Sequence, residues 1–155
     1  MLDIYKTFLF ILLTGNIAFG QSDIDNAVKY TLEFNRTNVH AGEVITLTAD
    51  LKIMKDFYVY SSHPEKSLSP TYIEWKDSSY FSKVGILQEP ANKTKYDPMF
   101  EMDIGYHTLQ VQFKQDLKIS DNINPGTYTL MVPLFFRLAI PENVSPIGMI
   151  FLFNS

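Results

Sequence analysis

In the stretch VITLTADLKI, residues 44–53, apolar and polar side chains alternate from Ile45 onward. An alternation with a period of two places the apolar side chains on one face of a β-strand and the polar ones on the other. The segment Val28–Phe34 follows the same rule, and the turn Ala41-Gly42-Glu43 lies between the two segments. We therefore predict a half-buried strand at each of them.

Outward from these segments, short runs rich in Val, Ile, Thr, Tyr and Phe are separated by Gly, Pro, Asn and Asp, as in consecutive strands. No segment spaces its apolar residues as a helix does over eleven or more positions, which disfavours helical and α/β folds. Pro133 predicts an edge or a bulge within its run, because proline cannot donate to the ladder. We predict an all-β fold, an immunoglobulin-like antiparallel β-sandwich of eight or nine strands. The remaining strands are expected at residues 57–61, 71–76, 83–87, 100–106, 108–117, 126–137 and 149–153.

Length and composition describe one globular domain. The chain has 155 residues, of which 46% are hydrophobic and 19% charged, so it has enough apolar side chains for an ordinary core. The net charge is −4 and lysines and arginines are not clustered, which argues against nucleic acid as a partner. The chain has no cysteine, so disulfides, thiolate metal sites and thiol redox chemistry are excluded.

The first 20 residues have the features of a signal peptide. Lys6 supplies a positive charge, residues 8–13 form a short apolar core, and Ala18-Phe19-Gly20 precedes the expected cleavage before Gln21. An uncleaved anchor is the alternative, but the apolar run is shorter than the roughly 20 residues that a spanning helix needs. We expect a domain over residues 21–155 that is periplasmic or secreted, with no membrane span in the mature chain.

Five short motifs occur in an order that resembles a known family. In chain order they are Ala41-Gly42-Glu43, Phe57–Ser61, Pro70-Thr71, Asp97–Phe100 and Pro125–Tyr128. Together they resemble the N-terminal periplasmic domain of the DsbD thiol:disulfide interchange proteins, over nearly all of the mature chain. The resemblance implies an immunoglobulin-like sandwich that passes electrons to periplasmic partners such as the disulfide isomerase DsbC.

The resemblance fails at the residues that would carry the redox chemistry. In the family, the redox pair is Cys-x5-Cys-x-Pro, and the matching segment here has Leu138 and Val144 at the cysteine positions, followed by Pro146. Thiol–disulfide exchange requires a thiolate that attacks a disulfide sulfur, and an aliphatic side chain cannot replace it. We therefore expect a cysteine-less variant that is not an enzyme and has no cofactor.

The surface around the lost thiols remains a candidate for protein binding, because the resemblance places aromatic and aliphatic side chains there. An alternative is that Leu138 and Val144 simply extend the core, as lone apolar residues in strands usually do. The expected patch consists of Tyr58, Tyr60, Asp97, Met99, Phe100, Leu138, Val144 and Pro146.

Other motifs give weaker indications. His40, His63 and His107 have neither the spacing of a zinc motif nor an evident carboxylate partner, so we expect no metal site and a surface or core role for each. Ser61-Ser62-His63 could suggest a nucleophile, but neighbouring strand residues point to opposite faces and no orienting acid is evident.

Three functions follow from these observations. The first is an exported binding module that has lost redox chemistry and keeps a docking surface for another exported protein. The second is an accessory subunit of disulfide-reduction or cytochrome c maturation traffic, which would bind a thioredoxin-fold protein that supplies the cysteines. The third is a structural sandwich of the cell envelope, which would associate through an exposed edge strand.

Overall fold

The computed structural model describes residues 27–75, 79–98, 100–128, 132–139 and 149–152. Its regular elements are nearly all strands, with one short 3₁₀ turn, η1. No helix among these residues is long and apolar enough to cross a membrane. The elements are β1 Val28–Phe34, β2 Val44–Ile53, β3 Tyr58–Tyr60, η1 Pro64–Lys66, β4 Tyr72–Ile73, β5 Phe81–Gln88, β6 Lys93–Asp97, β7 Met102–His107, β8 Gln110–Ile119, β9 Leu134–Ala139 and β10 Met149–Leu152.

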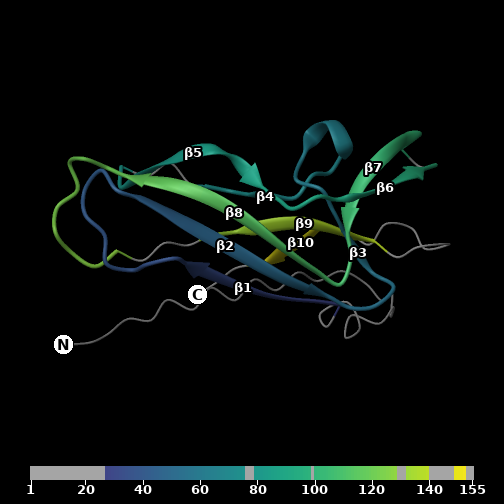
Figure 1. Ribbon diagram of the computed structural model, residues 1–155, viewed down its shortest axis with the longest axis horizontal. Helices are drawn as coiled ribbons and strands as arrows, with labels where there is room; N and C mark the ends of the chain where they lie inside the picture. Colours follow the sequence, from purple (N-terminus) through teal and green to yellow (C-terminus); the bar gives the residue numbers. More distant parts are fainter. Residues whose placement is uncertain (1–26, 76–78, 99, 129–131, 140–148, 153–155) are drawn as a thin grey trace, which may run out of the picture.

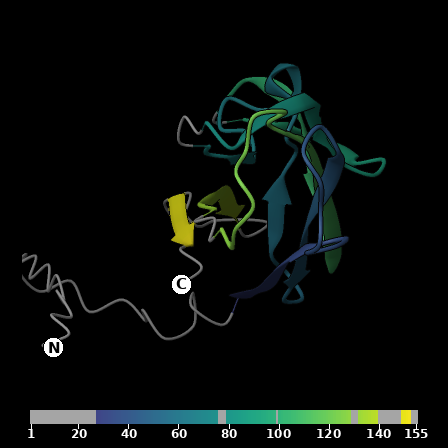
Figure 2. The ribbon, with the colours of Figure 1, turned by 90° about the vertical axis from the view of Figure 1, so that its left-hand side faces the viewer.

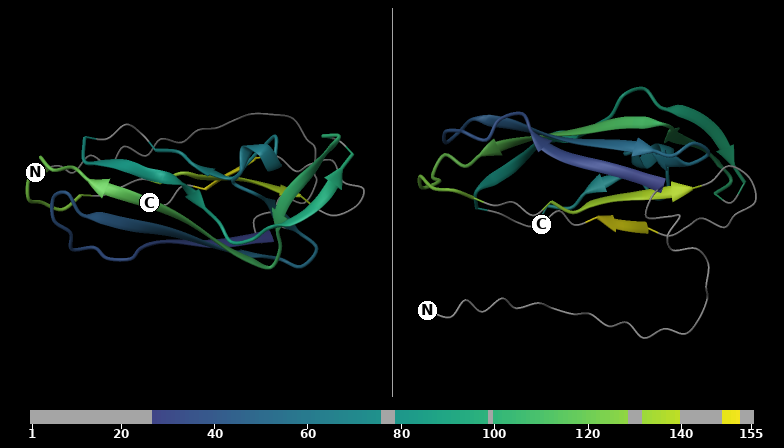
Figure 3. Two further views of the ribbon diagram at one scale, coloured as in Figure 1. Left: turned by 45° about the horizontal axis from the view of Figure 1, so that its top comes forward. Right: turned by 90° about the horizontal axis from the view of Figure 1, so that it is seen from below.

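The strands form two antiparallel sheets that pack face to face. One sheet has the order β1-β2-β8-β5, and the other has the order β10-β9-β3-β7-β6, with β4 also paired to β9. Figure 1 shows the long strands β2 and β8 in front of β9 and β10, and the two layers are seen from their side in Figure 3 (right). Figure 2 shows β10 beside β9 and apart from β1 and β2. The predicted all-β antiparallel sandwich is therefore confirmed.

The core lies between the sheets and is built by the alternation of each strand. Along β2, the side chains of Ile45, Leu47, Ala49 and Leu51 are buried, while the residues between them are half-buried. From the second sheet, Val59 of β3 and three side chains of β9 meet this apolar face. The period-two pattern of residues 44–53 thus predicted the buried face correctly. The β9 side chains are Leu134, Phe136 and Leu138.

The expected strand over residues 126–137 is shorter in the structure. Gly126–Tyr128 has no strand pairing, and β9 begins at Leu134, immediately after Pro133. Proline has no N–H to donate, so it stands before the ladder rather than within it, and its carbonyl oxygen accepts a hydrogen bond from the N–H of Glu74 at 3.0 Å. The edge or bulge expected at Pro133 was therefore misplaced.

Strand β6 was not predicted from the sequence. Its residues, KTKYD, are mostly polar, and Tyr96 is 61% exposed, so the segment has no apolar face that would mark it as a strand. It pairs with β7 from Lys93↔Tyr106 to Asp97↔Met102 and forms the edge of the second sheet. The β6–β7 hairpin lies at one end of the sandwich (Figure 1).

Candidate functional site

Strand β3 presents two tyrosines on the outer face of the second sheet. Val59 packs in the core between the sheets, so the side chains of Tyr58 and Tyr60 on either side of it point outward. Both are nonetheless buried, because they pack with Ile104 of β7 and Ala139 of β9 in a second apolar cluster. This cluster is separate from the main core.

The β6–β7 hairpin covers these tyrosines with further aromatic rings. The rings of Tyr58 and Tyr106 lie 5.2 Å apart, and those of Tyr60 and Phe100 lie 6.2 Å apart, both pairs in edge-to-face geometry. Such pairs add to the stabilisation given by apolar burial. We call Tyr58, Tyr60, Phe100 and Tyr106 the aromatic cluster.

Two cations lie over the aromatic cluster. Nζ of Lys95 is 3.8 Å from the ring centre of Tyr58 and 5.5 Å from that of Tyr106. The guanidinium group of Arg137 is 4.9 Å from the ring centre of Phe100 and 5.8 Å from that of Tyr60. The electron-rich faces of the rings attract these positive charges. Lys95 therefore lies on one side of the cluster and Arg137 on the other.

Asp97 fixes the turn of the hairpin against β3. The hydroxyl of Tyr60 donates a hydrogen bond to Oδ2 of Asp97 at 3.2 Å, and the N–H of Phe100 donates to Oδ1 at 3.4 Å. Burial raises the pKa of the Tyr60 phenol far above its usual value, and its hydrogen bond with Tyr58 and the charges of Tyr58 and Asp97 act in the same direction. Tyr60 therefore remains protonated and acts as a donor.

A small groove continues from the aromatic cluster along β9 and β4. The rings of Tyr72 and Phe135 are stacked, with centres 4.8 Å apart and planes 5° from parallel. Arg137 belongs to both regions, and its Nη1 donates a hydrogen bond to Oγ of Ser69 at 3.0 Å. The groove has a volume of about 170 Å³ and is mostly apolar. Its lining residues are Leu68, Ser69, Pro70, Tyr72, Phe135, Phe136 and Arg137.

The structure brings together only part of the expected patch. Tyr58, Tyr60, Asp97 and Phe100 lie together as described above. Leu138 is fully buried in the core between the sheets, on the opposite face of β9, and its neighbour Ala139 is the residue that contacts the tyrosines. The other expected members, Met99, Val144 and Pro146, lie outside the described residues.

Sequence reasoning missed Lys95, Tyr106 and Arg137. The alternation of β9 could have indicated Arg137 as a residue of the site, because Arg137 shares a face of the strand with Phe135 and Ala139. Lys95 could not be found in this way, because β6 itself was not recognised. Lys95 and Arg137 place positive charge over the aromatic rings.

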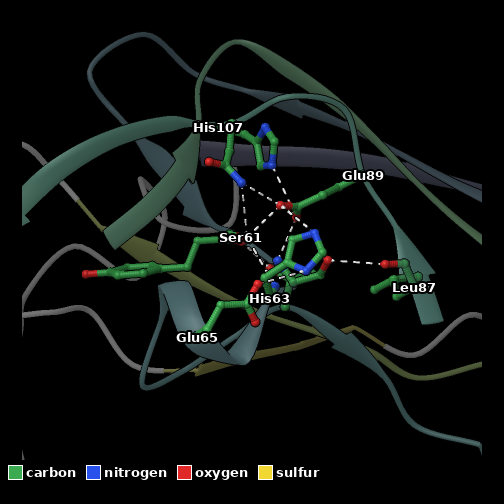
Figure 4. A network of polar contacts seen from close by, with 10 residues as sticks. Ser61, His63, Glu65, Leu87, Glu89 and His107 are labelled. Carbon is green, nitrogen blue, oxygen red and sulfur yellow. Dashed lines mark hydrogen bonds and ion pairs between the residues drawn. The ribbon is translucent and has the colours of Figure 1, made fainter. Parts of the chain in front are cut away.

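A network of polar side chains lies on the other face of the hairpin. The side chain of Glu89, which follows β5, is 1% exposed. Its carboxylate accepts hydrogen bonds from Oγ of Ser61 at 2.5 Å, from the N–H of Ser62 at 2.6 Å and from Nδ2 of Asn92 at 2.8 Å. We call these four residues, together with His63 and His107, the polar network (Figure 4). It connects the ends of β3 and β5 with the start of the hairpin.

Two imidazoles approach the same carboxylate from different sides (Figure 4). Nε2 of His107 lies 3.3 Å from Oε2 of Glu89 without hydrogen-bond geometry, and Nε2 of His63 lies 3.8 Å from Oε1. Nδ1 of His63 also lies 3.4 Å from Glu65. His40 lies close to Glu43. The expectation that the histidines lack carboxylate partners was therefore wrong. The fold brings the distant Glu89 to His63 and His107, and local contacts join His63 to Glu65 and His40 to Glu43.

The charged form of Glu89 is strongly favoured. Burial raises the pKa of this carboxyl, but the contact with His107 and the hydrogen bonds from Ser61, Ser62 and Asn92 outweigh burial and hold the pKa well below its usual value of 4.5. The carboxylate thus stays ionised in the folded protein and can accept hydrogen bonds from all three donors.

The polar network does not have the geometry of a catalytic triad. Oγ of Ser61 donates a hydrogen bond to Glu89 and accepts one from the backbone N–H of His63. It is therefore not bonded to an imidazole that could remove its proton. Ser61 is also fully buried, which prevents contact with a substrate. No cluster of three or more His, Asp or Glu side chains in the described part of the chain is arranged to hold a metal ion. The geometry indicates a structural role.

The fold and site together define a β-sandwich domain without thiol chemistry, whose outer face carries a covered aromatic cluster. Residues 26–135 match the family described as thiol:disulfide interchange protein DsbD, N-terminal, and the chain belongs to this family of periplasmic domains. It is a member without cysteine. The matched region ends before Leu138, so it does not include the segment that resembles the redox motif. No curated protein matches the chain.

Proposed function

We propose that this chain is an exported, non-catalytic binding module that docks to another protein through the aromatic cluster and its surroundings. The absence of cysteine removes thiol–disulfide exchange, while the outer face of the second sheet presents the aromatic cluster. Aromatic residues and arginine are enriched among the residues that dominate binding energy at protein interfaces. The function of the domain is therefore recognition rather than electron transfer.

The observation that carries this proposal is the arrangement around Phe100. Its ring packs edge-to-face with Tyr60, and the guanidinium group of Arg137 lies over both rings. The turn that Asp97 fixes holds Phe100 in this position. Phe100 is only partly buried, so a partner can contact it directly. A partly exposed aromatic ring in a fixed position is a suitable anchor for a protein interface.

The test is capture of exported proteins by the full chain and by a Phe100→Ala variant. We expect the variant to keep its fold, as judged by circular dichroism, and to lose most of the captured partner. Tyr96→Ala is the matched control, because Tyr96 is exposed on the same hairpin and its side chain points to the other face. Equal capture by wild type and Phe100→Ala would refute the proposal.

The identity of the captured protein distinguishes the proposed module from an accessory subunit of redox traffic. Family membership favours a thioredoxin-fold partner, which would supply the cysteines that this chain lacks. Recovery of such a protein, dependent on Phe100, would support the accessory role. Recovery of an unrelated envelope protein with the same dependence would support a general binding module.

Export is part of the proposal. The family is periplasmic, and residues 1–20 have the features of a signal peptide. Mass spectrometry of the protein from its producing cell tests this point. A mature chain that begins at Gln21 is the expected result, and an uncleaved chain in the membrane fraction would contradict it.

A further inference from the structure

The groove and the aromatic cluster form one continuous surface along β9. Phe135, Arg137 and Ala139 alternate on its outer face, where Phe135 lines the groove, Ala139 contacts the cluster and Arg137 lies between them. A strand rises by roughly 3.3 Å per residue, so the four steps from Phe135 to Ala139 span about 13 Å. That length suits about four residues of an extended peptide.

The charges on this surface are positive, and they have no carboxylate partner in the part of the chain that the structure describes. Neither Lys95 nor Arg137 forms a salt bridge within the described residues, although the chain as a whole has a net charge of −4. Both cations instead lie over aromatic rings, and both side chains are only partly buried. Each can therefore accept a carboxylate from a partner without first breaking an ion pair.

Among the described residues, the carboxylates of the β6–β7 hairpin form no ion pair with either cation. Asp97 is buried and accepts hydrogen bonds from Tyr60 and Phe100. Asp103 pairs with Tyr96 in the hairpin, so its side chain points to the face away from the cluster. Glu101 lies exposed in the turn between β6 and β7. Arg137 and Lys95 are therefore the cations that lie over the aromatic cluster, while Lys93 on the same face of β6 donates a hydrogen bond to Thr108.

We infer that this surface binds an extended segment of another protein in which an apolar side chain is followed by carboxylates. The apolar side chain enters the groove between Leu68 and the stacked rings of Tyr72 and Phe135. The carboxylates contact Arg137 and Lys95 in turn. Opposite charges of this kind give specificity, and they speed association at low salt. The inference rests on the proposed function and adds the chemistry of the partner.

The probe is a synthetic peptide, acetyl-Gly-Ser-Leu-Asp-Asp-Gly-amide, titrated into the isotopically labelled full chain and followed by NMR. The comparison peptides replace both Asp by Asn, or Leu by Ala. We expect both replacements to weaken binding, and the Asn peptide to bind about tenfold more weakly, which corresponds to ~1.4 kcal/mol. Added salt should reduce this difference.

Variants of the protein locate the effect. Arg137→Gln and Lys95→Gln are expected to reduce the preference for the Asp peptide over the Asn peptide. Leu68→Ala is expected to reduce the preference for the peptide with Leu over the peptide with Ala. Lys114→Gln is the matched control, because Lys114 is exposed on β8 of the other sheet, and it should change neither preference. Absence of binding at millimolar concentration, equal binding of the Asp and Asn peptides, or equal effects of Lys114→Gln would overturn the inference.

The proposed function can survive that result. If capture of an exported protein depends on Phe100 but is unchanged in Arg137→Gln and Lys95→Gln, the docking face is correct and the acidic partner segment is wrong. If capture does not depend on Phe100 either, the proposed function fails as well.

Discussion

The hydroxyl of Tyr60, in the middle of the second sheet, donates a hydrogen bond to Oδ2 of Asp97 at the end of β6, at 3.2 Å. The two residues are 37 positions apart in the sequence, and their contact fixes the tip of the hairpin over the aromatic cluster. This bond joins the buried part of the sandwich to the surface that we propose for docking.

Replacing Tyr60 by Phe should destabilise the fold by about 1–2 kcal/mol, because Asp97 loses one donor in a buried position. The free energy of unfolding in urea measures this change. Tyr96→Phe removes a hydroxyl from an exposed ring of the same hairpin and should have little effect. Unchanged stability in Tyr60→Phe would show that the hydrogen bond contributes nothing to the fold.

Replacing Glu89 by Gln should lower the free energy of unfolding by about 2–3 kcal/mol. The amide removes the buried negative charge that Ser61, Ser62 and Asn92 contact, and it places an NH₂ group beside some of these donors. Urea unfolding at neutral pH gives the cost. Glu65→Gln is the control, because its side chain is 65% exposed. Similar losses in the two variants would contradict the role assigned to the polar network.

Glu89 should also make stability depend on pH. Its pKa is lowered by folding, so its contribution is fully present above the usual value of 4.5 and is lost progressively as the pH falls below that value. Wild type should therefore lose more stability than Glu89→Gln between about pH 5 and pH 3. Parallel stability curves for the two proteins across this range would disprove the assignment.

Replacing Gly105 by Ala should destabilise the hairpin. A Cβ atom there would lie 3.0 Å from Cβ of Ser61 and 3.1 Å from the side chain of Asn92, both in the polar network. Overpacking of this kind costs about 1–3 kcal/mol, which thermal unfolding detects. Gly126→Ala is the control, because a Cβ atom there would meet only the ring of Tyr128 at 3.6 Å. A melting temperature as high as that of the control would show that the site has room.

Replacing Leu138 by Ala distinguishes a core residue from a surface residue. Leu138 is fully buried between the sheets, so the cavity should cost about 2–5 kcal/mol. Capture of the partner by the folded variant should be unchanged, in contrast to the loss expected for Phe100→Ala. A small change in stability together with lost capture would instead place Leu138 in the binding surface.

Strands with one buried face could be predicted from the sequence, as residues 44–53 show, because their apolar pattern reflects local geometry. Strand β6 could not, because it packs Lys95 over aromatic rings and has almost no apolar side chains of its own. The contact between Glu89 and His107 also could not be predicted, because it depends on how β5 and β7 are placed by the fold. Tyr58 and Tyr60 were found through a family resemblance rather than through their pattern.

The attachment of the hairpin on both of its faces has a consequence for the kinetics of recognition. One face is held through Asp97 and the aromatic rings, and the other through Gly105, His107 and the polar network. A partner therefore meets a surface that is already ordered and loses little conformational entropy when it binds. Association should follow a single second-order step, with a rate set by diffusion and by charge rather than by refolding of the loop.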